Sequence, residues 1–131
     1  MSKISINREL KDHTTVKLED IDGVVDASCE AVMAYDILDD AHENKYALLS
    51  KLISKVRKDG SITICGLDVE VLAYKLAVQL VSVEDFTDVI YRKNIISAMM
   101  LKNILTKAGL IISSISINTQ LNIYEIVASK P

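Results

Sequence analysis

The sequence predicts a single α/β domain over residues 1–131, with a mostly parallel sheet flanked by helices and an antiparallel strand pair at the C-terminal end. Three observations predict it. Short apolar or β-branched runs alternate with helical patterns. Half of the residues are hydrophobic, which is typical of strands buried on both faces or of an apolar subunit interface. Pro131 is the only proline, and no repeat or low-complexity segment suggests a linker.

Three strands are expected in the first third of the chain. Residues 2–7 alternate between apolar and polar side chains, and residues 14–18 are rich in β-branched ones. Residues 31–38 (AVMAYDIL) form an apolar run that ends in acidic residues. We expect this run to be a buried strand that continues into a loop.

The next segment predicts a helix followed by a strand. Residues 43–58 have an amphipathic pattern with basic residues in the last turn, where they suit the helix dipole. The apolar stripe consists of Tyr46, Leu49, Ile53 and Val56, and the basic residues are Lys55, Arg57 and Lys58. Gly60 is expected to end the helix, and residues 61–65 (SITIC) to form a buried strand.

Two further helices are predicted in the second half. Residues 69–81 show helical periodicity with Asp68 as a plausible N-cap, and residues 95–108 form a helix closed by Gly109. Residues 83–92 fit neither pattern clearly.

The chain finishes with two alternating segments, residues 110–118 and 121–129, around Thr119 and Gln120. They predict an antiparallel pair.

Composition excludes several function classes. A net charge of −3, no Trp and one Phe argue against nucleic-acid binding. No apolar run reaches the length of a membrane span, and the N-terminal residues do not resemble a signal peptide. Cys29 and Cys65 lack metal-ligand spacing and predict small buried side chains in a reducing compartment. We therefore expect a cytoplasmic protein without a metal site.

Six segments carry a family resemblance, and they occur in the order ISINREL, TVKLED, VDASCEAVMAYDILDDAH, KYALLSKLISKVRKDGSITICGLD, LKNILTKAGL and ISSISINTQLNIYEIVASKP. They resemble the second, third and fourth strands, the helix and fifth strand, the last helix, and the terminal strands of class I S-adenosylmethionine-dependent methyltransferases. The resemblance covers nearly the whole chain from Ile4 and implies a Rossmann-like sheet. Each motif is degenerate, so the resemblance rests on their order.

One part of the family pattern is absent: the opening strand and the Gly-x-Gly loop that lets the backbone approach the cofactor. The four glycines lie elsewhere, at Gly23, Gly60, Gly66 and Gly109. A sheet that lacks an interior strand has unpaired edges, which must be closed by rearrangement, by oligomerisation or by another polypeptide.

The resemblance also points to two cofactor-binding candidates. Glu9 stands near the acid that binds the cofactor ribose, and Asp20 stands near the position that binds the adenine amine. Each also has a simpler interpretation, Glu9 as a solvated turn acid and Asp20 as a loop or cap residue.

The catalytic candidates are Asp36, Asp39 and His42, because the resemblance places this segment opposite the methyl-transfer centre. The pKa of histidine lies near neutrality, so His42 suits a general base. The same acidic stretch is alternatively an N-terminal cap of the following helix.

The sequence therefore leads to a degenerate, non-catalytic methyltransferase-like domain that acts as a binding or assembly subunit, in a homo-oligomer or with a partner protein. The alternative is an active small methyltransferase that uses S-adenosylmethionine on a small molecule, with the cofactor site completed by a neighbouring chain. The missing loop favours no cofactor over S-adenosylmethionine. A third interpretation is a generic α/β interaction protein.

Overall fold

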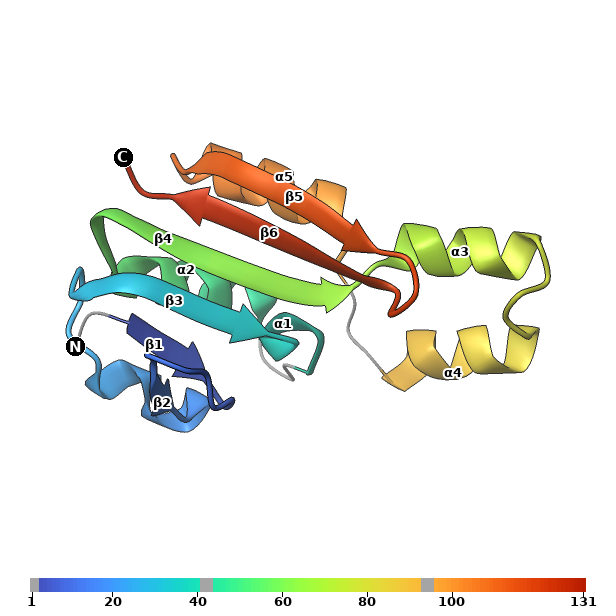
Figure 1. Cartoon of the computed structure of the whole chain (residues 1–131), viewed down its shortest axis with the longest axis horizontal. Coiled ribbons are helices and arrows are strands. Elements are labelled where there is room, and N and C mark those ends of the chain that lie inside the picture. Colours follow the sequence, from blue (N-terminus) through green and yellow to red (C-terminus); the bar gives the residue numbers. More distant parts are fainter. Residues whose placement is uncertain (1–2, 41–43, 93–95) are drawn as a thin grey trace.

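The computed structural model describes residues 3–40, 44–92 and 96–131, apart from the side chains of residues 39, 40 and 90–92 (Figure 1). Six strands form one sheet in the order β2-β1-β3-β4-β6-β5. They are β1 (Lys3–Ile6), β2 (Thr14–Val16), β3 (Cys29–Tyr35), β4 (Val56–Leu67), β5 (Ile111–Asn118) and β6 (Ile123–Ser129). The first four strands pair in parallel, whereas β6 is antiparallel to both β4 and β5. The predicted fold class is confirmed.

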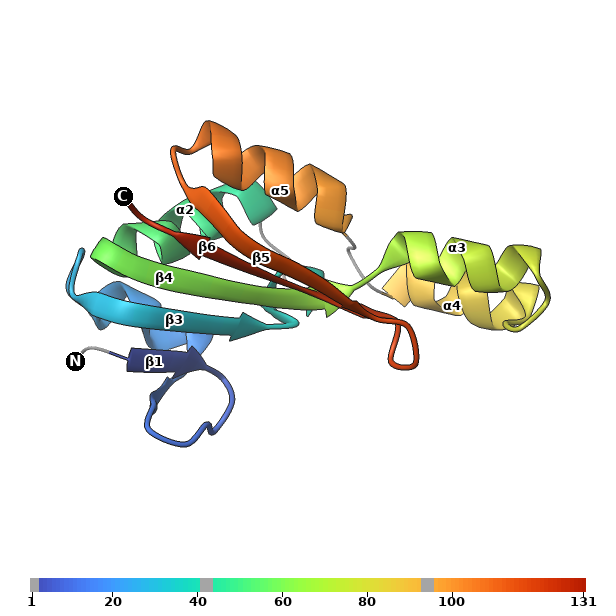
Figure 2. The same cartoon turned by 45° about the horizontal axis from the view of Figure 1, so that its top comes forward.

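The described helices are the short 3-10 helix η1 (Leu18–Gly23), α1 (Ile37–Asp40), α2 (Lys45–Lys55), α3 (Val69–Ala77), α4 (Val83–Arg92) and α5 (Ala98–Lys107). Helices α2 and α5 pack on one face of this sheet. Figure 2 shows α2 and α5 on the same side of the sheet, while α3 and α4 lie together beyond the end of β4. The segment that fitted neither pattern, Val83–Arg92, is therefore a helix.

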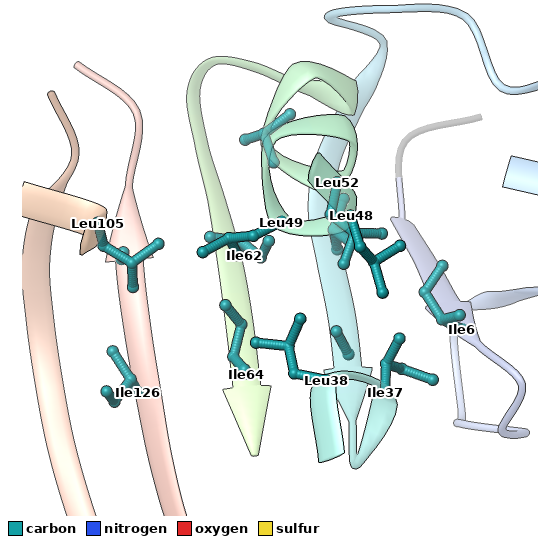
Figure 3. Close-up of a cluster of buried hydrophobic side chains, with 14 of the residues drawn as sticks. Ile6, Ile37, Leu38, Leu48, Leu49, Leu52, Ile62, Ile64, Leu105 and Ile126 are labelled. Carbon is teal, nitrogen blue, oxygen red and sulfur yellow. The ribbon is translucent and has the colours of Figure 1, made fainter. Parts of the chain in front are cut away.

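The core lies between the sheet and these helices (Figure 3). Leu48, Leu49 and Leu52 of α2 pack toward Ile62 and Ile64 of β4. All five side chains are at most 2% exposed. Burial of one such side chain stabilises a fold by about 1.5–3 kcal/mol, so the face shared by α2 and the sheet contributes much of the stability.

Inside the sheet, β1 pairs directly with β3, with Ile4 opposite Val32. The gap expected for an absent interior strand can be closed by rearrangement, by oligomerisation or by another polypeptide. Direct pairing of β1 with β3 is a rearrangement within the chain. In the described part of the chain, the two edge strands are β2 and β5.

Helix α2 differs from its prediction at both its end and its buried face. It ends at Lys55, and β4 begins at Val56, so Arg57 and Lys58 belong to a strand. Val56 continues the helical spacing of apolar residues, which is why the pattern hides the boundary. Because Val56 pairs with Cys29 of β3, it belongs to strand β4 and not to helix α2.

The buried face of α2 is also rotated from the predicted stripe. Tyr46, predicted to face the core, is 56% exposed, whereas Leu48 and Leu52 are buried. The chain carries apolar residues on several sides of this helix, so spacing alone did not select the correct face.

Gly60 lies within β4 and does not end α2. A Cβ at this position would lie 2.9 Å from the carbonyl oxygens of both Cys29 and Glu30. Glycine is needed here because two backbones approach closely.

Three helix ends bear on the predictions. Asp68 caps α3, because its Oδ1 accepts hydrogen bonds from the backbone N–H groups of Glu70 and Val71 at 3.0 and 3.3 Å. Gly109 follows α5 with φ +90°, as predicted. The cap of α2 is Asn44, so the acidic stretch before residue 41 does not cap that helix.

Candidate functional site

The candidate site lies where β1 and β3 end side by side. From β1 the chain continues to β2 on one side, and from β3 it continues to β4 on the other. Such a switch point at the carboxyl ends of parallel strands opens a crevice in which α/β proteins bind ligands. A cleft of about 410 Å³ occupies this place. We call it the switch-point cleft, and its lining consists of Ile6, Asn7, Arg8, Leu18, Tyr35, Asp36 and Ile37.

Asn7 fixes the rim of the cleft next to β2. Its backbone adopts the left-handed conformation with φ 56°, which asparagine tolerates better than most residues. Its N–H donates to the carbonyl of Val16 at 2.9 Å, and its Oδ1 accepts from the N–H of Leu18 at 2.8 Å. The ends of β1 and β2 are therefore tied together by one residue.

Arg8 crosses from the end of β1 to the end of β3. Its guanidinium lies 4.7 Å from the centre of the Tyr35 ring, a cation–π contact. Its backbone is held by Ser5, whose hydroxyl donates to the Arg8 carbonyl, and by Thr15, whose hydroxyl donates to the same carbonyl at 3.5 Å. Hydrogen bonds therefore hold the backbone of Arg8, and its guanidinium places a positive charge in the cleft.

Asp36 forms the opposite rim. It also has a left-handed backbone, with φ 61°, and its N–H donates to the carbonyl of Cys65 at 2.9 Å. This bond joins the ends of β3 and β4 and leaves the Asp36 side chain exposed. Two non-glycine residues in this conformation flank one cleft, and such strained positions often gather at functional sites.

The groups beneath the rim are held in their neutral forms. Burial raises the pKa of Tyr35, with Cys65 and Glu125 adding to the effect and Arg8 opposing it. Burial, followed by the charge of Glu125, raises the pKa of Cys65 to about 12. The Cys65 thiol donates to Oε2 of Glu125 at 3.5 Å. A thiol with this pKa is protonated at neutral pH and is a poor nucleophile.

Among the residues that the structure describes, the lining of the cleft offers one cation, one carboxylate, one phenol, one amide and apolar walls. The described residues hold no cluster of three potential metal ligands. None of the helices in the described ranges has the length and hydrophobicity needed to cross a membrane.

Of the three catalytic candidates, Asp36 is the one whose side chain the structure describes, and it lines the switch-point cleft. Asp39 lies in α1, where only the backbone is described. His42 falls outside the described residues. Their proposed catalytic roles remain predictions.

The two cofactor-binding candidates lie nearby but do not line the cleft. Glu9 follows Arg8 on the exposed turn after β1, and Asp20 is exposed on η1. Their roles also remain predictions. Sequence reasoning missed Asn7, Arg8 and Tyr35. The available signal was their position at the ends of two predicted strands.

Comparisons with known proteins identify the fold. No protein-family model matches the chain, and neither does any curated protein. Solved structures do match, among them a SAM-dependent methyltransferase from Archaeoglobus fulgidus, with 18% identity, a TM-score of 0.60, and coverage of 91% of this chain and 68% of that one. The protein therefore has the fold of the S-adenosylmethionine-dependent methyltransferases.

Two other matches extend the comparison. Magnesium protoporphyrin IX methyltransferase from Synechocystis PCC 6803, with bound SAH, has 14% identity and a TM-score of 0.58 over 91% of this chain and 51% of its own. A chain from the complex between the Haloferax volcanii Trm112 methyltransferase activator and the putative methyltransferase has 12% identity and a TM-score of 0.62 over 95% and 64%. This chain thus spans about half to two thirds of the length of the structures that it matches.

Proposed function

We propose that this chain is a non-catalytic methyltransferase-like domain that acts as a binding or assembly subunit. The observation that carries the proposal is the position of Arg8 across Tyr35 in the switch-point cleft. S-adenosylmethionine carries a positive sulfonium, and a guanidinium held in the same cleft repels it. This repulsion between Arg8 and the sulfonium supports a cleft that does not hold the cofactor.

The backbone around the cleft supports the same conclusion. The residues that follow β1 and β3 are Asn7, Arg8 and Asp36, and none of the chain's glycines lines the cleft. These turns carry side chains, so they do not offer the close backbone approach that a glycine loop gives to a ligand. β1 also pairs directly with β3, so the interior of the sheet is a continuous hydrogen-bonded ladder with no gap between these strands.

A binding role is supported by the surface of the protein. Large apolar side chains are exposed on α3, on the turn that follows it, on α5 and on the β5–β6 hairpin, among them Tyr74, Leu80, Met99, Ile117 and Leu121. Tyr74, Leu80 and Ile117 line one hollow. Apolar surface that gathers in this way marks interaction sites in many proteins. One matching structure comes from a complex with an activator protein, so a protein partner has a precedent on this fold.

Thermal unfolding with S-adenosylmethionine or S-adenosylhomocysteine tests the proposal. A ligand present at about 100 times its Kd adds about 2.7 kcal/mol to the free energy of unfolding. For a domain of this size, that gain raises Tm by about 5 °C or more. We expect a shift below about 1 °C with either compound. A large shift that Asp36→Asn abolishes would instead support the enzyme alternative.

A further inference from the structure

Strand β5 is an edge of the sheet and is exposed along almost its whole length. All of its residues except Ile112 are exposed, including Ile111 at 59%, Ile115 at 41% and Ile117 at 51%. Residues 110–120 carry no charged side chain, although the whole chain has a net charge of −3. Edge strands usually carry charges that prevent pairing with another chain, so this edge is unusually open to it.

The regular part of β5 has a definite centre. The pairing of β5 with β6 shifts register between Ile112 and Ser114, and from Ser114 to Asn118 it is continuous. Ser116 is the middle residue of this regular part. An antiparallel partner strand centred at the same residue would avoid the irregular segment of both strands.

Ile115 and Ile117 of β5 face the side of the sheet that carries α5. Ile115 pairs with Ile126 and Ile117 pairs with Tyr124, and both β6 residues are fully buried. Side chains at paired positions lie on the same face. A hollow of about 120 Å³ between α5 and β5 is lined in part by Met99, Ile115 and Ile117. Met99 is itself 57% exposed.

We propose that two copies of this chain pair through their β5 edges, antiparallel, about a two-fold axis at Ser116. In this register Ile115 of each copy lies opposite Ile117 of the other, and Ser114 lies opposite Asn118. Four isoleucines then form one apolar cluster beside the two Met99 side chains. The two sheets become one continuous sheet, and both β5 edges are removed from solvent.

The occupant is a second copy because the edge is complementary to itself. A two-fold interface places the same residues on both sides, and apolar residues meet apolar residues only in a register such as this one. The paired strands bring no like charges opposite each other, since residues 110–120 are uncharged. This inference rests on the assembly part of the proposed function and names its partner.

Sedimentation velocity over about 1 to 200 µM protein tests the dimer. We expect a concentration-dependent species with twice the 14.5 kDa mass of the chain. Ser116→Lys places two ammonium groups opposite each other at the axis and should raise the dimer Kd at least about tenfold. The matched control is Ser50→Lys, at an exposed position on α2, which should leave the Kd unchanged. Circular dichroism confirms that both variants fold.

A cross-linking experiment fixes the register. Residues directly opposite in an antiparallel pair have Cβ atoms about 4.5–5.5 Å apart, which is close to disulfide range. Under mild oxidation, Ser116→Cys should give a disulfide-linked dimer, whereas Ser50→Cys should not. The natural cysteines, Cys29 and Cys65, are buried and do not compete.

A monomer at every concentration would overturn the inference, as would larger open-ended assemblies or a dimer that Ser116→Lys leaves intact. The thermal-shift experiment with S-adenosylhomocysteine is run on the same samples. A monomer without a shift overturns the dimer alone. A β5 dimer with a large shift overturns the non-catalytic proposal alone.

Discussion

At the scale of single residues, two residues with left-handed backbones tie neighbouring strand ends together beside the switch-point cleft. Asn7 and Asp36 both adopt left-handed backbone conformations and both bond to the neighbouring strand through their N–H groups. Asparagine and aspartate are the residue types that tolerate this conformation without glycine. The cleft is therefore bordered by side chains, and these side chains determine which ligands it accepts.

Lys55 is the clearest case of a charge placed inside the fold. Its side chain is 7% exposed. Its Nζ donates to the carbonyl of Val24 at 2.9 Å and to Oδ1 of Asp26 at 2.7 Å. The amphipathic pattern placed Lys55 on the solvent side of α2. The pattern failed because the η1–β3 connection supplies oxygen acceptors there, which no local spacing reveals.

The Lys55–Asp26 pair predicts a pH-dependent stability. The hydrogen bond and charge of Lys55 lower the pKa of Asp26 below its ordinary 3.8. A carboxyl with a lowered pKa stabilises the fold above its unfolded-state pKa, and this stabilisation is lost as the pH falls through the folded-state pKa. Asp26→Asn should therefore lower the free energy of unfolding near neutral pH, and the difference from the wild type should shrink as the pH falls below 3.8 and through the lowered folded-state pKa of Asp26.

Urea unfolding at several pH values measures this difference. Asp22→Asn is the matched control, because Asp22 pairs with Lys51 at 3.2 Å but both side chains are exposed. Exposed pairs contribute little, so that variant should stay close to the wild type at all pH values. A pH-independent loss in Asp26→Asn would contradict the account.

At the scale of elements, the sequence predicted strands and helices well and their boundaries less well. The order of strand, helix and terminal antiparallel pair is confirmed because each element has its own period of apolar residues. The junction between α2 and β4 was wrong because Val56 satisfies both periods. The pairing of Val56 with Cys29 places Val56 in β4. Because these two residues are far apart in the sequence, local spacing does not reveal the pairing.

Gly60 provides the test at this scale. In Gly60→Ala the added Cβ would meet two backbone oxygens at 2.9 Å, which cannot move as a side-chain end could. We expect a loss of about 1–3 kcal/mol in the free energy of unfolding. Gly23→Ala is the control, since a Cβ there meets nothing within 4 Å. Equal stabilities of the two variants in denaturant unfolding would show that β4 does not approach β3 as described.

At the scale of the whole molecule, the fold was predictable and most of the site was not. The ordered segments led to a methyltransferase-like sheet, which the solved structures confirm. The cleft required knowing that β1 pairs with β3, because only this pairing brings Arg8 to Tyr35. Asp36 was a candidate because the family resemblance places its segment facing the methyl-transfer centre, whereas no motif singled out Arg8.

We propose that this chain keeps the methyltransferase fold without the cofactor site, and isothermal titration calorimetry measures cofactor binding itself. S-adenosylmethionine and S-adenosylhomocysteine are titrated separately into about 100 µM folded protein, at which micromolar binding is readily detected. The account predicts no heat above dilution for either compound. Saturable binding with a micromolar Kd would contradict it, and would show that the cleft beside Arg8 accepts the cofactor after all.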